Sequence, residues 1–221
     1  MCDPHRIRAL AEARKARDPT HPGCVIYSIG SNGDFGFELG MQQQTGPGTC
    51  EFHIFDFGNY EAAMRQSGLA RAFYHRWGLV KQKPPSKNWG WAGSQKAPTP
   101  TINTKGEFYG LLDIVRLLGH QDLDVIDVFK IDCEKCEWDT YTDWLSPEIP
   151  MLHQILVEVH GAPKDKALDF YDSMEKEGYL RFHKEPNIQW DPNCIEYAMV
   201  KVDREFMGSR QGEATKDQFI N

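Results

Sequence analysis

Acidic, small and imidazole side chains recur directly after apolar, β-branched segments of this sequence. Residues 30–33 (GSNG) follow VIYSI, Asp56 follows FHIF, Asp132 follows VIDVFKI, and His160 follows QILVEV. Carboxylates and imidazoles are the usual general acids and bases, and glycine lets a backbone approach a ligand closely. If these segments are parallel strands, their carboxyl ends meet at the edge where open α/β sheets bind ligands. The pattern therefore predicts a ligand site at that edge.

The turn after the first apolar segment, S-I-G-S-N-G-D-F-G, is suited to a ligand that contacts backbone just ahead of a helix. It is not G-x-G-x-x-G, because Asn32 stands in place of the second glycine, and it lacks the G-K-[ST] of a P-loop. Asp56 at the end of the second strand can accept hydrogen bonds from both hydroxyls of a ribose, which indicates a nucleoside ligand. Tight helix packing is the alternative role of such a turn.

Asp132, Glu134 and His160 are the candidate catalytic residues. His160 has the best ordinary pKa for a general base, and its alternative role is to orient the following loop. Asp132 is the second candidate, either as a base or as a carboxylate that favours a cationic cofactor. Glu134 could face the site or only add charge at the next helix N-terminus, where Glu137 would cap the helix. With Glu158 these residues could hold Mg²⁺ or Mn²⁺, but the spacing is generic, so we predict no metal.

Six cysteines in 221 residues are too few to indicate a disulfide scaffold. Only Cys133 and Cys136 are close, and no second pair at ligand spacing follows that would complete a zinc site. A redox C-x-x-C usually lies near the first strand of its domain, whereas this one lies past the middle of the chain. We therefore expect two small side chains packed near a strand end, and the cysteines do not indicate a redox compartment.

The elements that position these residues alternate between strand and helix. We expect strands at residues 25–29, 52–55, 72–77, 125–131, 154–159, 179–183 and 195–202. We expect helices at residues 34–44, 60–67, 107–118, 137–145 and 166–176, and a long loop at 80–106. Such alternation predicts a mainly parallel sheet covered on both faces. The loop before the last strand is too short for a crossover, so the final two strands should form an antiparallel hairpin on a seven-stranded, Rossmann-like α/β sheet.

Four segments, taken in order, carry a resemblance to a known family: VIYSIGSNGDFGFE, HIFDF, FKIDCEKCEW and QILVEVH. They resemble class I S-adenosylmethionine-dependent methyltransferases, and most closely the FkbM-type branch and the eukaryotic methyltransferase-like 24 group. The FkbM-type pattern D-x-G-A-N-x-G is matched at Gly30 and Asn32. The pattern I-D-x-E-G-x-E-W is matched at Ile131, Asp132, Glu134, Glu137 and Trp138, with Lys135 replacing the glycine. The resemblance covers about residues 24–202.

The resemblance implies S-adenosylmethionine as the cofactor. The residues that would line its methionine and ribose are Gly30, Ser31, Asn32 and Gly33. Asp56 would hold the ribose hydroxyls, Phe57 would lie against the adenine, and Asp132 would face both the sulfonium and the substrate. Two positions depart from the family. Ser28 replaces the acid that binds the cofactor's amino group, and Asp34 replaces the closing glycine and could take over that contact.

Methyl transfer to a hydroxyl of a small molecule or glycan is the function this resemblance implies. The alternative is a non-catalytic binding domain of the same fold, suggested by Ser28 and Asp34. A nicotinamide-dependent oxidoreductase is disfavoured by the missing second glycine and by the terminal hairpin. Trp89, Trp91 and Trp190 fall in predicted loops, where indoles stack on sugar faces or pack beneath the loop.

Composition and charge limit the other classes of protein that this sequence could belong to. Hydrophobic residues make up 40% and charged residues 26%, the balance of a globular domain. The net charge of −7, with scattered basic residues, argues against a nucleic-acid partner. We predict neither a membrane span nor a signal peptide, because no long apolar run occurs. We expect a helical extension at 1–22, a methyltransferase domain at 23–205 and a polar tail at 206–221; oligomeric state and localisation cannot be read from the sequence.

Overall fold

The computed structural model describes residues 3–83, 100–103, 106–161, 163–188, 191 and 193–202. Its helices are α1 (Pro4–Arg17), α2 (Gly36–Thr45), α3 (Glu61–Gln66), α4 (Leu111–Leu117), α5 (Glu137–Trp144) and α6 (Lys164–Lys176). Its strands are β1 (Cys24–Ile29), β2 (Cys50–Phe55), β3 (Ala72–His75), β4 (Trp77–Leu79), β5 (Thr101–Asn103), β6 (Gly106–Tyr109), β7 (Val125–Ile131), β8 (Met151–His160), β9 (Tyr179–Pro186) and β10 (Cys194–Lys201). The three tryptophans at 89, 91 and 190 and the predicted tail at 206–221 lie outside these residues.

Seven strands form one twisted sheet in the order β3-β2-β1-β7-β8-β10-β9. Strands β3, β2, β1, β7 and β8 are parallel, whereas β10 runs antiparallel to both β8 and β9. The predicted Rossmann-like α/β fold with a C-terminal antiparallel hairpin is confirmed. Strand order reverses at β1, which pairs with β2 on one side and β7 on the other, so β1 and β7 flank the switch point.

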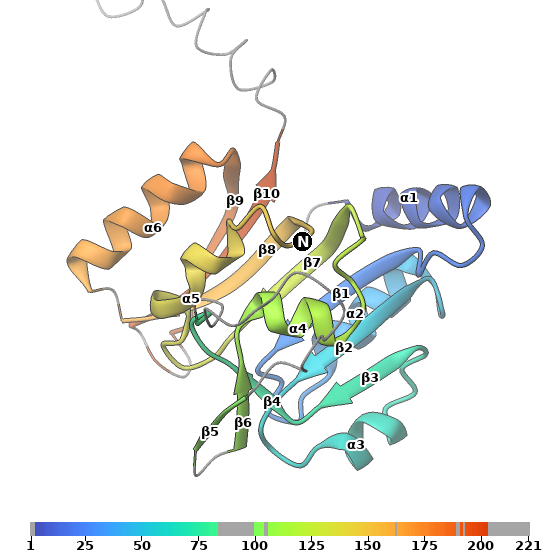
Figure 1. The fold of residues 1–221 in the computed structure, drawn as a ribbon, viewed down its shortest axis with the longest axis horizontal. Helices are drawn as coiled ribbons and strands as arrows, with labels where there is room; N and C mark the ends of the chain where they lie inside the picture. Colours follow the sequence, from blue (N-terminus) through green and yellow to red (C-terminus); the bar gives the residue numbers. More distant parts are fainter. Residues whose placement is uncertain are drawn as a thin grey trace, which may run out of the picture.

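Alternation along β1 sends side chains to two separate cores. Val25, Tyr27 and Ile29 pack into the larger core, which also contains buried residues of α4, α5 and α6. Cys24 and Ile26 face the smaller core, which contains buried residues of α1, α2 and α3. Every residue of β1 is buried, as expected for a central parallel strand covered on both faces. Figure 1 shows the sheet between these two groups of helices.

Three predicted elements from β3 to α4 differ from the structure. The predicted strand 72–77 is two strands, because β4 leaves the main sheet and pairs with β6 in a separate three-stranded sheet with β5. The predicted helix 107–118 begins only at Leu111, since the preceding residues form β6 and Gly110 has an extended backbone. The predicted loop 80–106 contains β5. Among the described residues, no helix has the length and apolar character to cross a bilayer.

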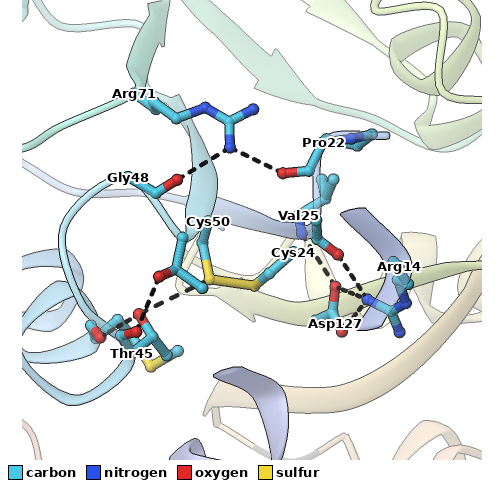
Figure 2. Close-up of a disulfide and its surroundings, with 12 residues drawn as sticks. Arg14, Pro22, Cys24, Val25, Thr45, Gly48, Cys50, Arg71 and Asp127 are labelled. Carbon is cyan, nitrogen blue, oxygen red and sulfur yellow. Dashed lines mark hydrogen bonds and ion pairs between the residues drawn. A yellow bond between two sulfur atoms is a disulfide. The ribbon is translucent and has the colours of Figure 1, made fainter. Parts of the chain in front are cut away.

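Disulfides are present where the sequence predicted none. Cys24 and Cys50 are directly opposite each other on neighbouring strands β1 and β2 and form one bond (Figure 2). Cys133 and Cys136 form the second. The sequence interpretation of the second pair as packed, unbonded side chains is wrong. Cys194 is free and buried.

Helix α1 is attached to the sheet by a buried ion pair. Arg14 Nη1 donates to Asp127 Oδ1 at 2.8 Å and to the Gly23 carbonyl at 2.9 Å. Asp127 lies on β7 and also accepts the Val25 N–H at 3.0 Å (Figure 2). The two side chains are 14% and 3% exposed, so the charges are almost fully removed from water. Ile7 and Ala11 of the same helix belong to the smaller core.

Replacing Arg14 by methionine is expected to lower the free energy of unfolding by about 3 kcal/mol, because the Asp127 carboxylate would stay buried without its cation. Urea denaturation followed by circular dichroism measures the loss. Arg17→Met is the matched control, since Arg17 is exposed in the last turn of the same helix. Equal stability of the two variants would contradict a structural role for the pair.

Candidate active site

The carboxyl ends of β1, β2, β7 and β8 carry the predicted site residues, and the structure brings them together in two contacting groups. The first group joins the turn after β1 to Asp56, which follows β2. The second joins Asp132, after β7, to His160 at the end of β8. Asp132 links the groups, because its backbone N–H donates to the Ile29 carbonyl at 3.0 Å and its own carbonyl lies against Gly30.

Asp56 fixes the turn after β1. Its Oδ2 accepts the N–H of Ser31 at 3.1 Å and of Asn32 at 2.8 Å, while Oδ1 accepts the N–H of Gly58 at 2.7 Å. The residue is only 8% exposed. A carboxylate has about four lone-pair sites, so Oδ1 retains one acceptor position after these three bonds. Asp56 therefore orders the backbone of the turn and keeps one position for a ligand hydroxyl.

Gly30 can be replaced by no other residue without moving the chain. Its φ is 78°, in the left-handed region, and a Cβ there would lie 1.7 Å from the Asp132 carbonyl oxygen. The Gly30 carbonyl accepts from Lys130 Nζ at 3.1 Å. The turn after β1 thus packs directly against the backbone of Asp132, which follows β7. Among the described residues, no side chain separates the two segments at the switch point.

Gly33 and Asn32 continue the turn with positive φ values of 78° and 47°. A Cβ at Gly33 would meet the ring of Tyr60 at 2.8 Å, and the Tyr60 hydroxyl donates to Asn32 Oδ1 at 3.0 Å. Phe57, the predicted adenine contact, is 41% exposed, and its ring centroid lies 6.1 Å from that of Phe108 on β6. The small sheet therefore places a second ring beside the predicted adenine position.

Asp34 is exposed, and its Oδ1 accepts the Gly36 N–H at 2.8 Å at the start of α2. Helix α2 begins at Gly36, and no side chain caps it at Phe35.

Glu38 on α2 is a site residue that the sequence analysis missed. Its carboxyl is 1% exposed, and burial raises its pKa despite the nearby Ser28 hydroxyl and the Lys130 cation. Ser28 Oγ and Glu38 Oε2 are both buried atoms without a hydrogen-bond partner among the described residues. Ser28 stands where the resembling family has an acid, and Glu38 places a carboxyl beside it from α2.

His160 is held by Glu137 beneath the second group. Glu137 Oε1 accepts the His160 N–H at 2.7 Å and lies 3.2 Å from Nδ1, and Glu137 is fully buried. His160 Nε2 is 3.5 Å from Asp132 Oδ1 and 3.7 Å from Glu134 Oε2. The predicted helix cap at Glu137 is wrong, since its side chain turns inward to the histidine. Glu134, with its side chain 86% exposed, does reach the site.

The pKa values of this group reverse the predicted order of bases. The hydrogen bond with Glu137 raises the pKa of His160 to about 9, so its imidazole is protonated at neutral pH. Burial and the nearby Glu158 raise the pKa of Asp132 to about 6, so its carboxylate is mostly ionised at neutral pH. Asp132 is thus the carboxyl whose pKa lies near neutral pH, and the protonated His160 lies beside it.

Two overlapping sets of metal-ligand side chains share His160. One is Asp132, Glu134 and His160, and the other is Glu158, His160 and Cys194, each with ligand atoms within 4.8 Å. Metal binding requires the neutral imidazole, and Glu137 stabilises the charged form. We therefore retain the prediction of no metal at this site. Asn187, from the segment Glu185-Pro186-Asn187, donates to Glu158 Oε1 at 2.9 Å and so contributes to the same edge.

The Cys133–Cys136 disulfide closes a ring around Glu134 and Lys135, whose φ values of 57° and 85° are left-handed. Lys135 stands where the FkbM-type pattern has glycine, and the positive φ explains that preference. Lys135→Gly is expected to raise the free energy of unfolding by about 1 kcal/mol, because glycine adopts this conformation without steric cost. Urea denaturation without reductant measures the change. Lys176→Gly, within α6, should instead destabilise; a loss of stability in Lys135→Gly would show that the strain is absent.

The strand order, the glycine turn and the acidic edge define a Rossmann-like domain of the methyltransferase type. Residues 1–201 match the family model Methyltransf_22, described as a methyltransferase domain. The chain belongs to this family.

Two solved structures resemble the fold. One is a proposed rRNA methylase from Clostridium thermocellum, at 9% identity and a TM-score of 0.48, with 91% of this chain and 94% of that chain covered. The other is the METTL16 methyltransferase domain, at 12% identity and a TM-score of 0.42, with 90% of this chain and 66% of that chain covered. A comparison with curated proteins gives no match.

Proposed function

We propose that the protein is an S-adenosylmethionine-dependent methyltransferase that acts on a hydroxyl of a small molecule or glycan. Membership of a methyltransferase family supports the transfer, and the resemblance to FkbM-type and methyltransferase-like 24 proteins supports the acceptor. The observation that carries the proposal is Asp132: a carboxylate with a pKa of about 6, placed against the glycine turn at the switch point.

The residues present fit this cofactor. The turn at Gly30 and Gly33 offers backbone without Cβ atoms, and Asp56 keeps one acceptor position for a ribose hydroxyl. Ser28 Oγ and Glu38 Oε2 are buried acceptors that lack partners among the described residues, which suits a cationic amine. We assign the amine contact to Glu38 rather than to Asp34, since Asp34 Oδ1 is already bonded to the Gly36 N–H at the start of α2.

The cofactor and the protein have separate roles in the proposed methyl transfer. Bound S-adenosylmethionine supplies an electrophilic methyl group on a sulfonium. The chain aligns the acceptor and removes its proton, because displacement at a sulfonium needs little further help. Asp132 accepts the hydroxyl proton, and the His160 imidazolium 3.5 Å away stabilises the ionised carboxylate.

The acceptor side is strongly acidic. Glu134 reaches His160 from the surface, and Glu196 pairs with Glu158 across β8 and β10. Burial raises the pKa of Glu196, and the nearby carboxylates of Glu158 and Glu185 raise it further. Such an edge repels a phosphate backbone. This supports a neutral or cationic hydroxylated acceptor over a nucleic acid.

Calorimetric titration with S-adenosylhomocysteine and S-adenosylmethionine tests the cofactor. We expect micromolar binding by the wild-type chain and at least about tenfold weaker binding by Asp56→Asn, which loses anionic acceptors for the turn. Asp139→Asn is the matched control, because Asp139 is an exposed acid on α5. Circular dichroism checks that each variant folds. No binding by the folded wild type would support the alternative, a non-catalytic binding domain.

A further inference from the structure

A second cluster of side chains that can bind a metal ion lies at β2, away from the carboxyl ends of the strands. Glu51 and His53, two residues apart on β2, face the same side of the sheet, the side that α4 covers. His120 follows that helix in the sequence. Strands rise about 3.3 Å per residue, so His53 lies on the order of 10 Å along β2 from Asp56 and Glu51 farther still. The cluster is therefore separate from the candidate active site.

Hydrogen bonds hold each histidine ring through its Nδ1 atom. His53 Nδ1 lies 3.1 Å from His75 Nε2, and His120 Nδ1 lies 2.8 Å from the Tyr27 hydroxyl. The two rings meet edge to face, with centroids 4.8 Å apart. His53 Nε2 is buried without a hydrogen-bond partner among the described residues, and the side chain is only 7% exposed.

A carboxylate completes the set. Glu51 Oε1 is bound by Arg71, whereas Glu51 Oε2 faces His53 Nε2 at 3.6 Å, beyond hydrogen-bond distance. One ligand atom from each of Glu51, His53 and His120 lies within 4.8 Å of the other two. Glu51 Oε2 and His53 Nε2 are too far apart for a direct hydrogen bond. A central ion with ligand bonds of about 2.0–2.2 Å would require the three atoms to lie within about 4.4 Å of one another, a small movement from their present spacing.

We propose that Glu51, His53 and His120 bind a divalent transition metal ion, with Zn²⁺ the best match. Two imidazoles and one carboxylate are an established zinc donor set, with the fourth position left to water. His75, Tyr27 and Arg71 orient these ligands from behind, as outer partners of metal ligands do. The bound ion would link β2 to the segment that follows α4.

The test uses the full chain purified without a polyhistidine tag and freed of metal by chelator and desalting. Titration with Co²⁺ is expected to give one equivalent of visible d–d absorption that Zn²⁺ abolishes. Zn²⁺ at about 100 times its dissociation constant should raise the melting temperature by about 5–10 °C. Glu51→Gln, which preserves shape, should weaken binding at least tenfold, and His120→Gln should weaken it further.

Two controls locate the ion. His183→Gln removes an exposed histidine and should leave Co²⁺ binding unchanged. His160→Gln removes the histidine shared by both sets at the candidate active site and should also leave it unchanged. Loss of binding in His160→Gln with retention in Glu51→Gln would overturn the proposal. Absence of stoichiometric Co²⁺ and Zn²⁺ binding by the wild-type chain would overturn it as well, and would leave the cluster a set of mutually packed neutral rings.

Discussion

Alanine at position 30 is expected to abolish S-adenosylhomocysteine binding, with a loss of at least about 100-fold in affinity. The added Cβ would lie 1.7 Å from the Asp132 carbonyl oxygen, so either the turn or the end of β7 must move. The positive φ of Gly30 adds strain of about 1 kcal/mol or more. A displacement of 1 Å at a site is enough to cost about 100-fold in function. Calorimetric titration of the folded variant measures the loss.

Gly40→Ala is the matched control for this change. Gly40 lies within α2, and a Cβ there would meet no atom within 4 Å. Alanine in a helix interior is favoured over glycine by about 1 kcal/mol, so this variant should bind normally and be slightly more stable. If Gly30→Ala binds within threefold of the wild type, the turn after β1 is not part of the cofactor site.

The sheet was predictable because its central strands obey local rules. The segment VIDVFKI is β-branched and largely buried, its apolar residues are interrupted only by Asp127 and Lys130, and a turn signal follows it. The separate sheet of β4, β5 and β6 was not predictable in the same way. Its strands have three or four residues, and Phe108 and Leu111 happen to continue a helical spacing into α4. Pairing between distant short segments carries no local pattern.

The site divides in the same way, into residues placed by local sequence patterns and residues placed by packing between distant segments. Asp132 and His160 follow adjacent parallel strands, so the topology alone brings them to one edge. The inward turn of Glu137 and the burial of Glu38 depend on how helices pack, which spacing does not encode. For that reason the sequence ranked His160 as the base from its ordinary pKa, whereas its neighbour Glu137 raises that pKa to about 9.

Asp132→Asn is expected to reduce kcat for methyl transfer by about 10²–10³-fold, because the asparagine amide cannot accept the hydroxyl proton. The measurement is initial-rate kinetics across pH 5–10 with the acceptor identified in a substrate screen. In the wild type, kcat/KM should rise as Asp132 ionises near pH 6 and fall as His160 loses its proton near pH 9. These limbs belong to the coupled pair rather than to either group alone. The acidic limb should be absent from Asp132→Asn.

His160→Gln separates the two groups, since the sign of its effect is fixed by charge. The imidazolium lowers the pKa of Asp132, so its removal should move the acidic limb above pH 6 and abolish the basic limb. Asp139→Asn should change neither limb, because Asp139 is an exposed acid that pairs with Lys166 on α6. An acidic limb that stays in Asp132→Asn would assign the proton transfer to another group. An acidic limb that stays at the same pH in His160→Gln would mean that His160 is neutral in the active protein, and the histidine would then regain the role of base.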